Sequence, residues 1–357
     1  MEGATQKTDR VSGLDSIRFV CAMWVFFGHG AAPPLVDALG RDSHIALVVR
    51  GLYNNIWSGL SAVIVFFVIS GFCIHYPFAE TSKRLNLLEF YSRRFFRLLI
   101  PVAVAIPLSH ALGVKLLLFQ ESVLWSLLAE LIYYVIYPAL LAARHACRSW
   151  TPIILGSYVV SYAIVLTNPR TVDFTSYGMA LCWLAGLPCW LLGCALAESV
   201  RQGSSRAPLP RAIWLWRAGI LSAAWVCSAL RFHTPVGYPW TLNLFALLVF
   251  AWLLREITFR RTNPPAAWLE WAGLWSYSIY LMHPAAWRLF DRLPSIHNEW
   301  LRWVVLCCFV LGVCYGFYLV IERPSHAIAR WASRLARGTP PIKTVLTPQI
   351  KPAPENL

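Results

Sequence analysis

The sequence predicts an all-α polytopic membrane protein with about ten transmembrane helices. Of its 357 residues, 58% are apolar and only 13% are charged, and the mean hydropathy is +0.54. Apolar runs long enough to cross a bilayer recur along the chain as far as residue 322. Soluble domains do not carry that share of apolar residues. We expect no cleavable signal peptide, because about a dozen polar residues precede a first apolar run that is long enough to span.

The distribution of basic residues supports this topology. A cytoplasmic N-terminus assigns 22 of the 31 Lys and Arg residues to the cytoplasmic side and eight to the outside, and leaves one within a span. The positive-inside rule describes this bias, so both termini are expected in the cytoplasm and the inner (plasma) membrane is the expected location. The net charge of +14 therefore implies no nucleic-acid partner. The ten expected spans cover residues 14–32, 56–77, 95–113, 120–142, 151–168, 177–199, 213–231, 239–257, 268–290 and 299–322.

The chain divides into three parts on composition. Residues 1–13 form a cytoplasmic segment, residues 14–324 form the membrane domain, and residues 325–357 form a basic, Pro-rich cytoplasmic tail. No internal repeat is visible, which disfavours a transporter built from repeated halves. The ten cysteines show no CxxC pairing and lie mostly in apolar runs, so we expect buried hydrophobic side chains instead of disulfides or a metal site.

The first span carries two ionisable residues, Arg18 and His29. They are eleven residues apart, close to three helical turns, so a regular helix places both on one face about 16 Å apart along the axis. An ionisable residue within a span usually faces the bundle interior and marks function. A structural interpretation is equally open, in which Arg18 reaches the lipid headgroups and His29 is held by a structural hydrogen bond.

Three arginines, Arg93, Arg94 and Arg97, precede the third span on its cytoplasmic side. Arg93 and Arg97 are four residues apart and share a helix face. One interpretation is ordinary positive-inside anchoring. The other is a phosphate clamp, because guanidinium groups bind phosphate oxygens in pairs and three of them suit a pyrophosphate-bearing ligand.

Later spans hold further polar residues. Glu130 is flanked by apolar residues and therefore needs a partner or a proton, and an ion pair with Arg18 would be a structural role for it. His283 lies close to a span end, which favours an interfacial position. The closing Glu322-Arg323-Pro324 is expected to end and cap the last helix. Gly71, beside Ser70, is expected to allow close helix packing.

In this order the motifs resemble the family 3 membrane acyltransferases, bacterial O-acyltransferases that modify sugars and polysaccharides. The resemblance extends from residue 14 to residue 324, and the ordered set is more specific than any single motif. The matching segments are LDSIRFVCAMWVFFGH with Arg18 and His29, Ser70-Gly71-Phe72, the Arg93, Arg94 and Arg97 cluster, Trp125-Ser126-Leu127 with Glu130, Tyr134, Tyr137 and Pro138, SYSIYLMHP, and Glu322-Arg323-Pro324.

The resemblance implies an enzyme that moves an acyl group, expected to be acetyl, from a cytoplasmic acyl-CoA to a hydroxyl. The acceptor would be a sugar, a polysaccharide or a lipid-linked glycan, and the membrane lipids are the surroundings. Neither a tightly bound cofactor nor a metal is implied. A histidine suits the role of base, since its ordinary pKa of about 6.5 lies near operating pH, and it could instead carry the acyl group transiently; both roles are open for His29. The implied residues are His29, Arg18 and Glu130 for catalysis, Arg93, Arg94 and Arg97 for the donor, and Ser70, Ser126, Tyr134, Ser278 and His283 for substrate.

The sequence departs from the family pattern at two places. Ser16 replaces the usual glycine of the opening motif, and Leu131 and Ile132 stand where the family often has Glu-Gln, which predicts a drier acceptor pocket. Two other functions remain open: a secondary transporter of a small anionic or sugar-like solute, and a scaffold subunit of a polysaccharide export system. The ordered motifs and the ionisable residues within spans disfavour both.

Overall fold

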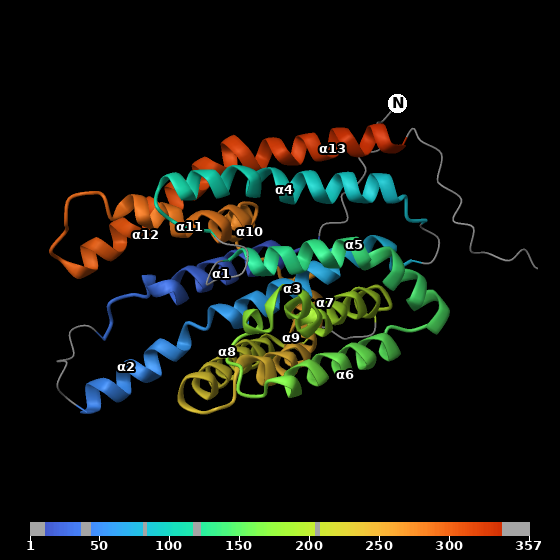
Figure 1. Cartoon of the computed structure of the whole chain (residues 1–357), viewed down its shortest axis with the longest axis horizontal. Helices are drawn as coiled ribbons and strands as arrows, with labels where there is room; N and C mark the ends of the chain where they lie inside the picture. The colour runs from blue at the N-terminus through green and yellow to red at the C-terminus, as the bar shows by residue number, and fades with distance from the viewer. Residues whose placement is uncertain (1–10, 37–43, 81–83, 117–122, 204–207, 338–357) are drawn as a thin grey trace, which may run out of the picture.

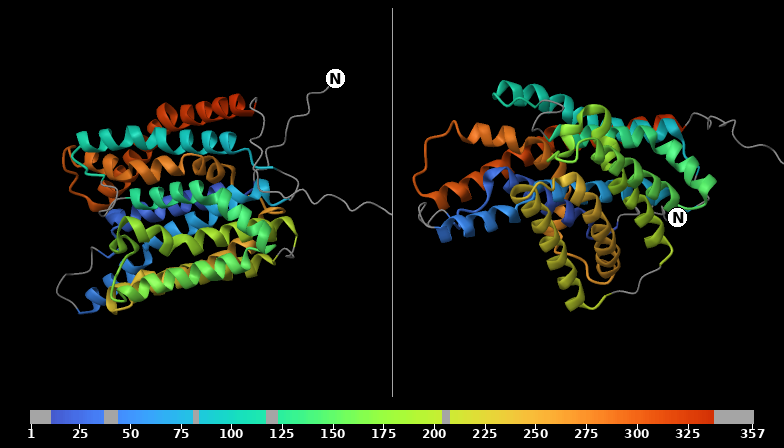
Figure 2. Two further views of the ribbon diagram at one scale, coloured as in Figure 1. Left: turned by 45° about the vertical axis from the view of Figure 1, so that its right-hand side comes forward. Right: turned by 60° about the horizontal axis from the view of Figure 1, so that its bottom comes forward.

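The computed structural model describes residues 11–36, 44–80, 84–116, 123–203 and 208–337, and within these ranges it contains helices and no strands (Figure 1). The elements are α1 Leu14–Phe26, η1 Phe27–Ala31, α2 His44–Ile56, α3 Gly59–His75, η2 Tyr76–Phe78, α4 Leu87–Ala111, α5 Leu124–Cys147, α6 Thr151–Thr167, η3 Phe174–Tyr177, α7 Gly178–Arg201, α8 Pro210–His233, α9 Tyr238–Arg260, α10 Ala267–Gly273, α11 Ser276–Phe290, α12 Glu299–Phe317, η4 Tyr318–Glu322 and α13 Arg323–Arg337. The long helices form a bundle (Figure 2), in which α3 packs against α7, α4 against α13 and α11 against α12.

The predicted membrane class is confirmed at the level of helices. Seven helical stretches in the described part of the chain are long and apolar enough to cross a bilayer, and α6 is a shorter apolar helix. Each of the ten predicted spans overlaps a helix, but the first is only 13 residues long before it changes type, and the ninth is divided into α10 and α11. The count of ten crossings and the orientation of the termini stay predictions.

The centre of the bundle is the contact between α3 and α7. A Cβ atom on Gly71 would lie 2.0 Å from the carbonyl oxygen of Trp190, and one on Gly193 would lie 2.1 Å from the carbonyl oxygen of Val68. Only glycine permits backbones to approach this closely, which confirms the packing role expected of Gly71. The close approach fixes Ser70, the neighbour of Gly71, relative to α7.

The end of α1 differs from a regular helix. From Phe27 to Ala31 the chain forms a wider π turn, and Gly30 ends it with a left-handed φ of 106°. In such a turn each residue rotates less about the axis than in an α-helix. The eleven-residue spacing of Arg18 and His29 therefore does not keep both side chains on one regular face.

The chain remains helical beyond the position where we expected the last helix to end. Pro324 directly follows π turn η4, and the helical stretch continues through it from Glu299 to Arg337. The prediction that Pro324 ends the helix is therefore wrong, and the N-terminal part of the predicted tail, up to Arg337, is a helix packed along α4 (Figure 1). Arg337 donates to Glu89 of α4 at 2.7 Å. The rest of that tail lies outside the described residues.

Candidate active site

Nine of the eleven predicted site residues line two cavities. The larger, which we call the arginine cavity, has a volume of about 460 Å³ and is bounded by α1, α3, α4, α5, α11 and the segment after α12. The smaller, the histidine cavity, has a volume of about 310 Å³ and lies toward the C-terminal ends of α4 and α11. The arginine cavity receives Arg18, Ser70, Arg94, Arg97, Ser126, Glu130 and Tyr134, and the histidine cavity receives His29 and His283.

The arginine cluster divides between cavity and surface. Arg94 and Arg97, three residues apart on α4, line the arginine cavity, whereas Arg93 is exposed and does not line it. The Nε–H group of Arg94 is buried and has no hydrogen-bond acceptor among the described residues. A buried guanidinium with a free donor beside a second guanidinium has the capacity to bind an anion.

Glu130 lies on the wall formed by α5. Its Oε1 accepts hydrogen bonds from Ser70 Oγ at 2.5 Å and from the Tyr134 hydroxyl. Trp190 in turn donates to Ser70 Oγ at 3.3 Å, so the chain of hydrogen bonds is anchored in the buried core. The carboxylate is thus oriented by two hydroxyls and leaves its second oxygen available to the cavity.

Arg18 does not form the ion pair with Glu130 that we considered as a structural role. Its guanidinium lies 3.5 Å from Asp15, one turn back on α1, and 3.6 Å from the Sγ atom of Cys73. Both Arg18 and Glu130 line the arginine cavity, so their charges face the same space. The cavity therefore contains three guanidinium groups and fixed carboxylates.

Glu322 is a cavity residue that the sequence argument assigned to a helix cap. It is only 1% exposed, lines the arginine cavity, and its Oε2 accepts from the backbone N–H of Ser278 at 3.1 Å and from the Ser278 hydroxyl. The capping interpretation of Glu322 is therefore wrong. Ser278 itself lines neither cavity, because its hydroxyl is directed to Glu322. An acidic residue at the end of a long apolar run was the available signal.

The two histidines of the histidine cavity contact each other. Nδ1 of His29 lies 2.8 Å from the Val25 carbonyl oxygen and 3.3 Å from Nε2 of His283, and Nδ1 of His283 lies 3.0 Å from the Ile279 carbonyl oxygen. A carbonyl oxygen only accepts, so each Nδ1 carries the proton. His283 then accepts from His29, and Nε2 of His29 keeps a lone pair for which the described residues supply no partner.

The interfacial interpretation of His283 is consequently wrong. The side chain is 0% exposed, and it lies against Phe26 as well as against His29. His283 accepts a hydrogen bond from His29 and so orients its ring. Catalytic bases are commonly oriented by a neighbouring side chain in this way. His29, in contrast, is exposed to the cavity.

A hydrogen-bonded partition lies between the two cavities. Ser126 Oγ and the Tyr280 hydroxyl are 2.6 Å apart, and they lie 3.0 Å and 3.2 Å from the Val123 carbonyl oxygen. Ser126 and Tyr280 line the arginine cavity, whereas Val123 lines the histidine cavity. Tyr280 and His283 are three residues apart on α11, so one face of this helix passes from the first cavity to the second.

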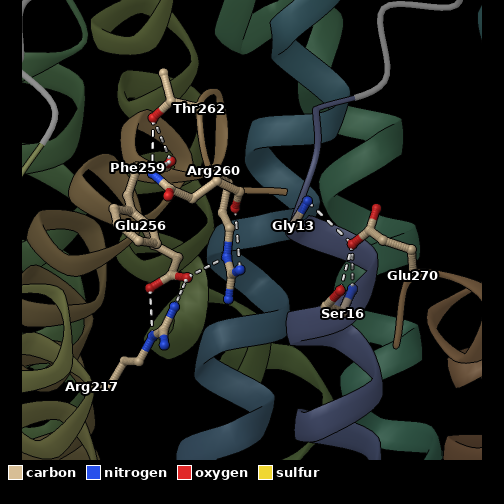
Figure 3. A network of polar contacts seen from close by, with 9 residues as sticks. Gly13, Ser16, Arg217, Glu256, Phe259, Arg260, Thr262 and Glu270 are labelled. Atoms are coloured by element: carbon tan, nitrogen blue, oxygen red, sulfur yellow. Dashed lines mark hydrogen bonds and ion pairs between the residues drawn. The ribbon is translucent and has the colours of Figure 1, made fainter. Parts of the chain in front are cut away.

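The start of α1 is held by Glu270 of α10 (Figure 3). Oε1 of Glu270 accepts from the backbone N–H groups of Gly13 and Ser16 at 3.2 and 3.1 Å, and from Ser16 Oγ at 2.5 Å. A carboxylate at a helix N-terminus satisfies free N–H groups and the helix dipole. Ser16, where the family usually has glycine, thus adds a donor to the contact that positions the turn carrying Arg18.

A neighbouring ion-pair network supports this contact. Glu256 of α9 is 2% exposed and binds Arg217 at 2.6 Å and Arg260 at 2.9 Å (Figure 3). A Cβ atom on Gly13 would lie 2.7 Å from the Cγ atom of Arg260, so the α1 entrance packs directly on this network. Glu270 and Glu256 were not singled out from the sequence, because partners from other helices are not visible in spacing along the chain.

Comparison with known proteins agrees with the sequence resemblance. The family model described as Acyltransferase domain matches residues 11–319, from just before α1 into the turn η4. No curated protein and no solved structure matches the chain. The match covers most of the chain, including the whole lining of the histidine cavity and all of the arginine-cavity lining except Glu322 and His326. The protein therefore belongs to acyltransferase family 3 and is a membrane acyltransferase that transfers acyl groups other than aminoacyl groups.

Proposed function

We propose that the protein transfers an acyl group, most simply acetyl, from acyl-CoA to a hydroxyl group of a sugar, a polysaccharide or a lipid-linked glycan. The observation that carries this proposal is the arginine cavity, in which three guanidinium groups surround a space of about 460 Å³. Such a set suits the phosphates of coenzyme A, because guanidinium forks match phosphate oxygens. The predicted ten-span topology would put Arg94 and Arg97 on the cytoplasmic side, where acyl-CoA is found.

The acceptor would enter the histidine cavity at the other end of α11. His29 Nε2 takes the proton of the acceptor hydroxyl as its oxygen bonds to the thioester carbonyl carbon. The carbon–sulfur bond then breaks, and the thiolate of coenzyme A leaves and takes up the proton from His29. One ester and one free thiol result from one thioester and one alcohol.

His283 would support this step without contacting substrate. When His29 becomes positively charged, its Nδ1–H continues to donate to the neutral Nε2 of His283 and to the Val25 carbonyl. Both acceptors stabilise the imidazolium, since hydrogen bonds with a charged donor are stronger than neutral ones. Glu130, held by Ser70 and Tyr134, and Arg18 would align the donor thioester near the partition.

Transfer across the partition requires that the acyl group pass Ser126 and Tyr280. The two hydroxyls contact each other and both contact the Val123 carbonyl oxygen, so three contacts compete for two hydroxyl protons. Their hydrogen bonds can therefore be rearranged at low cost. Opening the passage would begin with a local change in the positions of these two side chains. The family membership favours this function over the transport alternative.

The direct test is mass spectrometry of surface and lipid-linked glycans from cells with and without the gene. We expect a glycan that loses an acyl mass when the gene is removed and regains it when the wild-type protein is restored. Glycans of identical acyl content in the two strains, under conditions where the protein is present in the membrane, would contradict the proposal.

A further inference from the structure

The walls of the histidine cavity contain more positive than negative charge. Lys115, just after α4, and Arg288 on α11 line it together with one carboxylate, Asp291. Asp291 forms an ion pair with Arg302 of α12 at 3.3 Å, so its charge is already balanced from outside the lining. Lys115 and Arg288 form no ion pair with any described residue, and both are exposed to the opening.

The position of these cations is unusual for a membrane protein. Loops on the outer side are ordinarily poor in Lys and Arg. The ten-span topology assigns only eight basic residues to that side, and four of them, Lys115, Arg288, Arg292 and Arg302, fall on the segments around this cavity.

The remaining lining is suited to a sugar ring. Trp287 presents an aromatic surface beside the opening, and its ring lies against the end of the π turn at Gly30, where an added Cβ would approach it to 3.4 Å. An aromatic face binds the C–H face of a sugar ring, while charged side chains at the rim bind its substituents. His29 lines the same cavity, so a hydroxyl of a ring bound there would be within the space that His29 faces.

From these observations we infer that the acceptor is an anionic carbohydrate, whose carboxylate or phosphate is bound by Lys115 and Arg288 while a neighbouring hydroxyl faces His29. The inference rests on the proposed function, because it identifies the substrate class of the same site. A cavity lined by an excess of one charge concentrates the opposite charge and selects for it. Leu131 and Ile132, from which the sequence predicted a drier acceptor pocket, line neither of the two cavities, and the charged groups invoked here belong to α11 and the segment after α4.

The test is binding to the full-length protein in nanodiscs of uncharged lipid. Three oligosaccharides of equal length serve as probes: one neutral, one carrying glucuronate and one carrying a sugar phosphate. We expect at least one anionic probe to bind about tenfold or more tighter than the neutral one, and to lose this advantage as salt is raised. Which anionic probe binds distinguishes a carboxylate acceptor from a phosphate acceptor.

Variants make the assignment specific. Lys115→Gln combined with Arg288→Gln should reduce anionic binding to the level of the neutral probe, and Arg170→Gln, which removes an exposed charge elsewhere, should leave it unchanged. Coenzyme A affinity, which depends on the other cavity, should be retained in all three proteins and so reports that they are folded. The inference is overturned if anionic and neutral probes bind equally, if neither binds, or if the preference survives the double substitution. Anionic binding to a protein that transfers no acyl group would instead refute the proposed function.

Discussion

The arginine cavity and the histidine cavity differ in how their charged groups are held. Around the arginine cavity the carboxylates are fixed by hydroxyl groups, as Glu130 is by Ser70 and Tyr134 and Glu322 is by Ser278. Around the histidine cavity the two histidines contact each other and Asp291 is paired with Arg302, but Lys115 and Arg288 are exposed and form no ion pair with a described residue. A rigid site suits one constant ligand, whereas an open rim suits a variable and larger one. The difference agrees with a common donor on one side and a carbohydrate on the other.

The largest expected effect tests the role of His29 in the histidine cavity. His29→Gln keeps the size and hydrogen-bonding capacity of the side chain but cannot take up a proton near neutral pH. We expect acyl transfer to fall by about 10²–10⁴-fold, as is typical when a positioned base is lost. The glycan mass measurement in complemented cells checks this. His145→Gln, an exposed histidine at the end of α5, is the matched control and should transfer normally.

A smaller effect tests the partition between the cavities. Tyr280→Phe removes the hydroxyl that contacts Ser126 and the Val123 carbonyl oxygen. Losing these hydrogen bonds costs about 1 kcal/mol, which would raise the population of molecules with an open partition about fivefold. Cys73 lines the arginine cavity and reports on that opening. We expect a membrane-impermeant thiol reagent, added from the histidine-cavity side, to label Cys73 about fivefold faster in the variant.

Peptide mass spectrometry after labelling identifies Cys73 among the ten cysteines. Tyr277→Phe is the control, because its hydroxyl also lies at the arginine cavity but donates to the Leu98 carbonyl oxygen, away from the partition. Equal labelling rates in wild-type protein and Tyr280→Phe would show that these hydroxyls do not close the passage.

The sequence was sufficient for the helical membrane class, for the family and for most of the residues that line the cavities. Long apolar runs and ordered motifs are local properties of the sequence, so they can be recognised without knowing which helices pack together. It was insufficient wherever the answer depends on a neighbouring helix. By spacing alone, Arg97 shares a helix face with Arg93 and lies close to Arg94 as well. The packing of α5, α11 and α13 around α4 decides which of the two, Arg93 or Arg94, lines the cavity, and it is Arg94.

The other differences have the same origin. The predicted Arg18–Glu130 ion pair ignored the closer Asp15 and the hydroxyls that satisfy Glu130 from α3 and α5. Apolar periodicity does not reveal the π turn at Phe27–Ala31. The prediction that His29 lies on the same regular helix face as Arg18 was therefore wrong. The helix α13 was missed because its polar, basic sequence gains stability from packing on α4 and carries no spanning signal.

The central claim is that donor binding and proton transfer belong to different cavities. The most direct measurement is titration of coenzyme A against the purified protein in nanodiscs, for the wild type and for Arg94→Gln, Arg93→Gln and His29→Gln. Losing a charge-assisted hydrogen bond costs about 1.5–3 kcal/mol, so we expect Arg94→Gln to weaken binding by about 10–100-fold. Arg93→Gln, which removes an exposed arginine outside the cavity, and His29→Gln should both bind like the wild type. A loss of coenzyme A affinity in His29→Gln as large as in Arg94→Gln would contradict the claim.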